Sequence, residues 1–410
     1  MSKVFFFNIP FHGHVNPSLG LAQELVKKGE EVIYYGIDSF REKIESTGAR
    51  FRSYGDKFYL DENFVTYNLT ELFKVHMENS EFIMDKLLQD IERDKPDYIV
   101  HDSLATWGKC AAAAAGIPAI DTFTTIVLAP DGFLLTAGFI LSFALAMITN
   151  IPNVLKIQKI RKNLKNKYNV HIESLVDILC NRQDLNLVYT SDIFQPNRQA
   201  LGNEYKFIGP TSMFRKESIT GFSIDRRGNR PLLFISMGTI FNNNREFFDK
   251  CTEAFGDMEL DVLMSVGKNI NIPSLLIPEN FTVKPYNEIP QLEVLKECSI
   301  FMTHGGMNST HEGLYNGVPL IIIPQQQEQA HVAMQVVRTK SGICLKNSKI
   351  TPALLKQSVE KIMSDHSYRE NALKMRDSFI DAGGPERGVE EIFTYVRKTK
   401  IISSVSKIGG

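Results

Sequence analysis

Short apolar strands alternate with helical stretches along almost the whole chain, and this alternation limits the possible folds more than any other feature. KVFFFNI (3–9) is followed by the helical pattern PSLGLAQELVKKG, and the strands EVIYYG (31–36) and DYIVHD (97–102) recur after further helices. Because these strands are apolar along their whole length, both of their faces must be covered. The pattern therefore predicts the α/β class, with doubly wound parallel sheets between helices.

A polar stretch rich in Gly and Arg, KESITGFSIDRRGNRP (216–231), separates two runs of this pattern. The chain has 410 residues, about right for two domains of roughly 200 residues each. We predict two Rossmann-like domains, 1–215 and 216–385, that face each other across a ligand-binding cleft. We expect residues 386–410 to form a C-terminal helix and tail that pack back on the first domain.

Charge and cysteine content weaken the case for several function classes. Lys and Arg number 46 and Asp and Glu 47, and this near-balance gives no support for a nucleic-acid or anionic-membrane partner. The five cysteines are scattered and form no CxxC pair, as expected for reduced thiols. The chain also begins with a strand rather than a signal peptide, so we expect a cytoplasmic protein.

One uncharged stretch, GFLLTAGFILSFALAMITNIPNVL (132–155), is long enough to cross a bilayer. Its strongly apolar part is shorter, and Pro130, Gly138 and Asn150 interrupt its surroundings. A peripheral membrane contact is an alternative, but we expect an internal helix that lines an apolar pocket and no integral membrane span. A flat apolar wall of this kind predicts loose choice among hydrophobic ligands.

The segment HGGMNSTHEGLYNG (304–317) lies between two strands and predicts an anion site. Gly305 and Gly306 lack Cβ, so a ligand can approach their backbone closely. Asn308 or Ser309 can cap the helix that follows, whose N–H groups and dipole favour a phosphate. One turn further on, Glu312 could accept both hydroxyls of a ribose, and Gly317 suits the position that ends the helix.

A second Gly-bearing loop, SMGT (236–239), follows another strand of the same half. Two such loops suggest a diphosphate that is held from two sides, although both can also be ordinary strand-to-helix turns. The chain has no GxxxxGK[ST] motif, no GxGxxG after the first strand of either half, and no Asp-x-Asp pair. Phosphate charge must then be met by helix ends, His304 and hydroxyl groups rather than by a metal held by an Asp-x-Asp motif.

The segment FHGHVNPSLG follows the first strand, and Asn16 and Pro17 predict a helix that starts there, with His14 in the turn before it. Asp102 ends a strand of the same half, and parallel strands end at one edge of their sheet, so the two side chains can meet. A His held by a carboxylate is a competent general base. A purely structural role is equally consistent, and a zinc metallohydrolase that uses His12 and His14 is a further alternative.

Together with other motifs, these segments resemble the family 1 glycosyltransferases of GT-B fold, most closely the bacterial macrolide and flavonoid branch. The resemblance covers nearly the whole chain. It rests on motifs in this order: Gly-His-Val-Asn-Pro (13–17), Ser-Met-Gly-Thr (236–239), Pro-Gln-Leu-Glu-Val-Leu (290–295), His-Gly-Gly-Met-Asn-Ser (304–309) with Glu312, Gly-Val-Pro (317–319) and Glu-Gln (328–329).

The resemblance implies that His14 deprotonates an acceptor hydroxyl and that Asp102 orients it. It implies a single inverting displacement with a UDP-sugar, most simply UDP-glucose, as co-substrate, a hydrophobic hydroxylated acceptor, and no metal or other cofactor. The implied donor-binding residues are Ser236, Gly238, Thr239, Gln291, His304, Gly306, Asn308, Ser309, Glu312, Glu328 and Gln329. Among these, Glu312 would hold the ribose, and Glu328 with Gln329 the hydroxyls of the sugar.

The chain departs from the family pattern at two places. Where many relatives have a Trp that stacks on uracil, it has Glu288, with Tyr286 nearby, so a preference for UDP over dTDP is less secure than the phosphate contacts. Glu328 stands where many relatives have Asp, which bears on sugar choice. A non-catalytic protein that binds nucleotide sugars is the remaining alternative.

Overall fold

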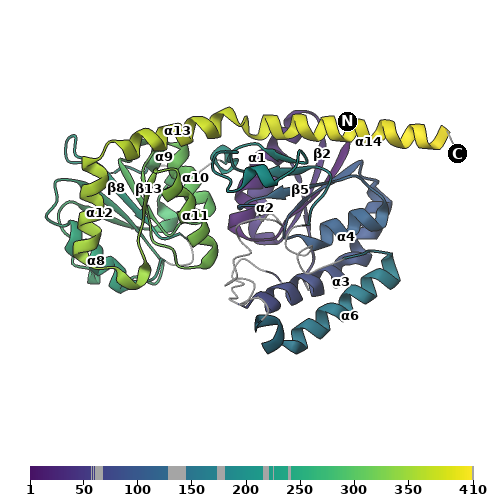
Figure 1. Cartoon of the computed structure of the whole chain (residues 1–410), viewed down its shortest axis with the longest axis horizontal. Coiled ribbons are helices and arrows are strands. Elements are labelled where there is room, and N and C mark those ends of the chain that lie inside the picture. Colours follow the sequence, from purple (N-terminus) through teal and green to yellow (C-terminus); the bar gives the residue numbers. More distant parts are fainter. Residues whose placement is uncertain are drawn as a thin grey trace. The chain divides into compact units, whose positions relative to one another are not determined.

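The computed structural model describes residues 1–56, 58, 60, 68–127, 145–172, 181–215, 221–224, 226–238 and 242–408. The chain forms two compact units (Figure 1). The first unit consists of residues 1–191, 195–214 and 382–410, and the second of residues 192–194 and 215–381. The end of the chain, residues 382–410, therefore belongs to the unit with which the chain begins.

Within the described residues, the strands of the first unit form a seven-stranded parallel sheet in the order β3-β2-β1-β4-β5-β6-β7. These strands are β1 (Lys3–Phe7), β2 (Glu31–Gly36), β3 (Arg50–Ser53), β4 (Tyr98–Asp102), β5 (Ala119–Phe123), β6 (Asn186–Val188) and β7 (Tyr205–Phe207). The helices are α1 (His12–Lys27), α2 (Arg41–Glu45), α3 (Leu69–Asp94), α4 (Thr106–Ala115), α6 (Ile151–Tyr168) and α14 (Gly384–Ile408), with 3-10 turns at Asp38–Phe40, Arg198–Ala200 and Ser212–Phe214.

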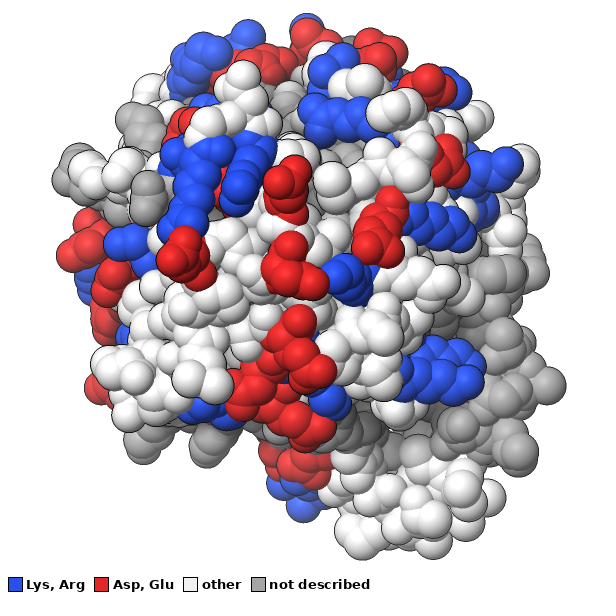
Figure 2. All heavy atoms as spheres, turned by 90° about the vertical axis from the view of Figure 1, so that its left-hand side faces the viewer, with Lys and Arg blue, Asp and Glu red and all other residues white. Residues whose placement is uncertain are grey.

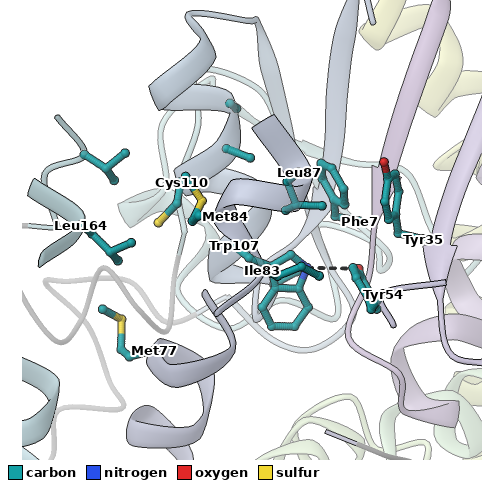
Figure 3. Close-up of a cluster of buried hydrophobic side chains, with 14 of the residues drawn as sticks. Phe7, Tyr35, Tyr54, Met77, Ile83, Met84, Leu87, Trp107, Cys110 and Leu164 are labelled. Atoms are coloured by element: carbon teal, nitrogen blue, oxygen red, sulfur yellow. Dashed lines mark hydrogen bonds between the residues drawn. The ribbon is translucent and has the colours of Figure 1, made fainter. Parts of the chain in front are cut away.

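The strands of this sheet have apolar side chains on both faces, and each face packs into its own core. Phe5 and Phe7 of β1 belong to a cluster with residues of α3, α4 and α6, whereas Phe6 belongs to a cluster with residues of α1 and α14. Figure 3 shows the first of these clusters, in which the indole N–H of Trp107 donates to the hydroxyl of Tyr54 at 3.1 Å. The continuous apolar strands are thus explained by helices on both sides of the sheet.

The second unit has a six-stranded parallel sheet within the described residues, in the order β10-β9-β8-β11-β12-β13. Its strands are β8 (Leu232–Ser236), β9 (Asp261–Val266), β10 (Phe281–Pro285), β11 (Ile300–Thr303), β12 (Leu320–Ile322) and β13 (Gly342–Cys344). Its helices are α8 (Arg245–Phe255), α9 (Gln291–Glu297), α10 (Met307–Tyr315), α11 (Gln327–Arg338), α12 (Pro352–Ser364) and α13 (Ser367–Asp381), with 3-10 turns at Ile272–Ser274, Tyr286–Glu288 and Asn347–Lys349. On the face shown in Figure 2, basic and acidic side chains are interspersed, in line with the net charge of −1.

The predicted fold class, two doubly wound parallel sheets, is confirmed. In each sheet the strand order reverses at one place, between β1 and β4 in the first unit and between β8 and β11 in the second. A crevice at the carboxyl ends of the strands opens at such a switch point, which is where sheets of this kind bind ligands. Most of the 132–155 stretch lies outside the described residues; in the part that is described, no helix is long and apolar enough to cross a membrane.

Candidate functional site

The helix after β1 begins at His12, so the prediction that Asn16 caps it and Pro17 opens it is wrong. Phe11 is the N-cap residue, and the N–H of Val15 closes the first turn on the carbonyl of Phe11 at 2.8 Å. A proline inside a helix deprives the carbonyl four residues earlier of its donor. Here that carbonyl belongs to Gly13, an exposed residue, and the helix continues through Pro17.

His14 lies in the first turn of α1, and the structure brings it together with Asp102 at the end of β4. Its Nδ1 is 2.8 Å from Oδ2 of Asp102, whose other oxygen accepts the N–H of Leu104 at 2.8 Å. The carboxylate is fully buried, whereas the imidazole remains 16% exposed. If Nδ1–H is donated to Asp102, Nε2 is the ring nitrogen whose lone pair can accept a proton, which is the arrangement that a general base requires.

Two further residues that sequence reasoning missed support this pair. The hydroxyl of Thr124, just beyond the end of β5, is 3.0 Å from Nδ1 of His14. The amide of Asn8, just beyond β1, donates to the carbonyl of His14 at 3.2 Å and so holds the start of α1. Both residues follow strands at the edge where His14 and Asp102 meet, and that position was the signal that could have identified them.

A further buried histidine lies near this pair. The ring of His76, on α3, is parallel to the ring of Trp107 at 6.3 Å between centroids. Neither of its nitrogens makes a hydrogen bond of good geometry among the described residues, although the nearby backbone of Leu104 acts to raise its pKa. Burial lowers its pKa to about 4, and this outweighs the opposite effect of nearby Asp102. His76 is therefore neutral at neutral pH.

The zinc alternative finds no support. The side chains of two residues that are two positions apart on a helix lie about 200° apart around the helix axis. Accordingly, the ring of His12 packs edge-on against Phe40 at 4.9 Å, whereas His14 faces Asp102. Within the described parts of the chain, no group of three or more His, Cys, Asp or Glu side chains is arranged to hold a metal ion.

In the second unit, the imidazole of His304 lies between the two Gly-bearing loops at the switch point of β8 and β11. A Cβ placed on Gly238 would lie 2.5 Å from Cε1 of His304, and one placed on Gly306 would lie 2.5 Å from its Nε2. A Cβ on Gly305 would meet Ile322 at 2.5 Å. The expectation that Gly305 and Gly306 leave open space for a ligand is therefore wrong at these Cβ positions: side chains of the protein fill that space.

The ring of His304 is half-buried, and desolvation lowers its pKa to about 4, so it is neutral and can donate one N–H without carrying charge. Gly238 has a φ of +75°, a conformation that suits glycine. Ser236 ends β8 beside Thr303 of β11. Thr239 lies outside the described residues.

Helix α10 starts next to this ring. Gly306 is its N-cap, so the prediction that Asn308 or Ser309 caps the helix is wrong; both lie in its first turn, where backbone N–H groups lack helical acceptors. Gly317 ends the helix as predicted, with a φ of +66°. Its N–H donates to the carbonyl of Leu314 at 2.8 Å, and the N–H of Val318 donates to the carbonyl of Gly313 at 2.9 Å. The N–H groups of the first turn and the helix dipole favour an anion beside His304.

Glu312, one turn into α10, is buried and already has two partners. Nε2 of Gln291 donates to one carboxylate oxygen at 2.6 Å, and the guanidinium of Arg215 donates to the other. Sequence reasoning placed Arg215 at the end of the first domain and gave it no role. Its contact brings a permanent positive charge to the predicted ribose-binding carboxylate.

The two predicted sugar-binding residues, Glu328 and Gln329, lie in the first turn of α11. Oε1 of Gln329 accepts the N–H groups of Gln325 and Gln326 at 2.8 and 3.2 Å and so forms a capping box, whereas Glu328 is exposed. The side-chain oxygen of Gln329 thus stabilises the start of the helix, and its side-chain nitrogen takes no part in the capping box.

Comparison with known proteins gives consistent results. Residues 250–393 match the family described as erythromycin biosynthesis protein CIII-like, C-terminal domain. The chain is 33% identical over 404 residues to the uncharacterized UDP-glucosyltransferase YojK of Bacillus subtilis (strain 168), covering 97% of this chain and 98% of the relative. It is 33% identical over 401 residues to the NDP-glycosyltransferase YjiC of Bacillus licheniformis, covering 95% and 96%. The structure of the calicheamicin glycosyltransferase CalG4 matches with a TM-score of 0.80 and 26% identity, covering 97% and 98%.

Proposed function

Because the chain belongs to the UDP-glycosyltransferases of GT-B fold, we propose that it moves a sugar, glucose in the simplest case, from a UDP-sugar to a hydroxyl of a hydrophobic small molecule. The relatives named UDP-glucosyltransferase and NDP-glycosyltransferase support the donor. The structural relative named calicheamicin glycosyltransferase supports a small-molecule acceptor. A flavonoid, phenol or macrolide would fit an apolar acceptor pocket. The prediction that the whole 132–155 stretch is an internal pocket wall is wrong for its described part, residues 145–155, because Leu145, Ile148, Ile151 and Leu155 are exposed.

The observation that carries the proposal is the hydrogen bond between His14 and Asp102. We infer a single displacement with inversion. Nε2 of His14 takes the proton of the acceptor hydroxyl, its oxygen bonds to the anomeric carbon, and the bond from that carbon to the UDP oxygen breaks as UDP leaves. Asp102 keeps Nδ1–H in place and stabilises the imidazolium that forms, while Thr124 restrains the ring.

The second unit supplies the donor site in this proposal. The diphosphate binds at the start of α10, where the N–H groups of the first turn and the N–H of His304 point to developing negative charge. The ribose hydroxyls join Gln291 and Arg215 at the carboxylate of Glu312, and Glu328 with Gln329 contact the sugar. Arg215, His304 and the helix end can together meet the phosphate charge, and we therefore propose that the reaction needs no metal.

The first test is titration calorimetry of the purified protein with UDP in the presence of EDTA, with dTDP and NAD as controls. We expect a Kd on the order of micromolar for UDP, weaker binding of dTDP and none of NAD. Absence of UDP binding in EDTA, together with its appearance on addition of a divalent cation, would refute metal independence. Absence of UDP binding under both conditions would refute the donor assignment.

His14→Ala provides a second test, because the proposed base and the proposed phosphate site belong to different units. Removal of the base should lower the rate of sugar transfer by at least about 100-fold. The Kd for UDP should stay within about twofold of the wild-type value, since the substitution lies outside the unit that holds the proposed donor site. An equal loss of transfer and of UDP affinity would contradict this division of roles.

A further inference from the structure

Helix α6 of the first unit has two unlike sides. Ile157, Ile160 and Leu164 are buried and belong to the apolar cluster shared with α3, which runs beside α6 in Figure 1. The opposite side carries Ile151, Leu155, Lys159 and Lys162, spaced four, four and three residues apart and therefore on one helix face. All four are exposed, Ile151 by 55% and Leu155 by 64%.

The apolar end of this face extends into the helical turn before α6. Leu145 and Ile148 are 58% and 68% exposed, so four large aliphatic side chains reach water within residues 145–155. Single exposed apolar residues are common, but a group of them usually marks a surface that is covered in use.

The other end of the face is basic. Helix α6 has six basic residues and no acidic residue: Lys156, Lys159, Arg161, Lys162, Lys165 and Lys167. Lys156 and Lys167 pair with Glu78 and Asp85 of α3 at 3.7 and 2.6 Å. No acidic side chain in the described part of the chain lies within ion-pair distance of Lys159, Lys162 or Lys165. The whole-chain charge balance thus conceals a local basic excess.

We propose that the face formed by Leu145, Ile148, Ile151, Leu155, Lys159 and Lys162, the α6 face, docks on the surface of a bilayer that contains anionic lipids. Aliphatic side chains beside lysines match the boundary between acyl chains and headgroups. There the aliphatic side chains enter the apolar layer and the lysines contact lipid phosphates. A nucleic acid would satisfy the lysines but would leave the four aliphatic side chains in water.

The α6 face is rigidly connected to the unit that holds His14. The side-chain amide of Asn153 donates to the hydroxyl of Thr70 on α3 at 3.3 Å, and the amide of Asn68, which caps α3, donates to Asn150 at 3.0 Å. Docking would therefore hold the first unit at a lipid surface, where hydrophobic hydroxylated molecules concentrate. The inference rests on residues 145–162 and does not depend on the identity of the sugar donor.

The test is co-sedimentation of the full-length protein with vesicles of phosphatidylcholine, with and without phosphatidylglycerol. We expect binding only to the anionic vesicles, with affinity that falls as salt is raised. Lys159→Gln/Lys162→Gln should weaken partitioning about 30-fold, since each lysine contributes about fivefold near an anionic surface. Ile151→Ser/Leu155→Ser should weaken it about tenfold or more.

Matched controls lie on the second unit. Leu276→Ser/Ile380→Ser removes two aliphatic side chains that are 87% and 50% exposed, and Lys349→Gln/Lys361→Gln removes two exposed lysines. These controls should sediment like the wild type. The proposal is wrong if the wild type stays in solution with anionic vesicles, or if the α6 variants sediment as it does. It is also wrong if the wild type is a dimer that Ile151→Ser/Leu155→Ser dissociates, because a second copy of the chain would then cover the face.

Discussion

Gly306→Ala should weaken UDP binding by moving His304 rather than by disturbing the backbone. The φ and ψ of Gly306 are −60° and 141°, values that alanine adopts without strain. The new methyl carbon, however, would lie 2.5 Å from Nε2 of His304, whereas ordinary contact needs about 3.5 Å. The ring must therefore move by about 1 Å.

The size of the effect follows from what His304 is proposed to do. One hydrogen bond to a charged phosphate contributes about 1.5–3 kcal/mol, so its loss should raise the Kd for UDP by about 10- to 150-fold. The free energy of unfolding should fall by only about 1 kcal/mol, since alanine is a poorer N-cap than glycine. Affinity should thus change far more than stability.

Titration calorimetry with UDP on four proteins tests this cause: wild type, Gly306→Ala, His304→Ala and the double variant. If the methyl group acts through the ring, Gly306→Ala should change the Kd by less than about twofold once His304 is alanine. Gly13→Ala is the matched control, because nothing lies within 4 Å of a Cβ at that position. It should leave UDP affinity unchanged.

Two outcomes would refute this reasoning. One is unchanged UDP affinity in Gly306→Ala, which would mean that the ring adapts or takes no part in binding. The other is an equal loss with and without His304. In that case the methyl group would block the phosphate directly, and the original expectation of open space at Gly306 would be restored.

Three further predictions concern charge and burial. Arg215→Met should lower the free energy of unfolding by about 3 kcal/mol in denaturant titrations, because a buried carboxylate loses its cation. His76→Phe should raise the melting temperature in calorimetry, since neither ring nitrogen of this buried residue makes a hydrogen bond of good geometry among the described residues. The free energy of unfolding should fall as pH decreases from about 6.5 to 4. Burial lowers the pKa of His76 and His304 to about 4 and that of His311 to about 3. These histidines therefore take up protons in the unfolded state at a higher pH than in the folded state. Asp121, with a pKa raised to about 6, partly offsets this loss, which equilibrium unfolding at several pH values would measure.

The meeting of His14 and Asp102 could be predicted because a topological rule places both residues at one sheet edge. The start of α1 could not, because the Asn-Pro pair is a signal for a helix start, whereas α1 begins four residues before Asn16 and continues through Pro17. The prediction that Asn308 or Ser309 caps α10 was wrong because Gly306, which has no side chain, is the N-cap residue.

Three strands also escaped prediction. β6, β7 and β13 have three residues each, too few to show a periodicity, and β6 begins with the polar Asn186. Asn186 is buried, and its amide donates to the carbonyl of Gln183 at 2.7 Å, a partner that no local pattern reveals. The contact of Arg215 with Glu312 likewise joins residues 97 positions apart and has no sequence signal.

The return of the chain to its first unit bears on how the protein can fold during synthesis. Val389, Ile392 and Val396 of α14 complete the cluster that also contains Val4 and Phe6 of β1, and the N–H of Gly384 donates to the carbonyl of Ile208 at 2.7 Å. Part of one face of the first sheet is therefore covered by residues that are made after the whole second unit. Until α14 has been made, that part of the face is exposed to chaperones and to other nascent chains, whereas all residues of the second unit have already been made.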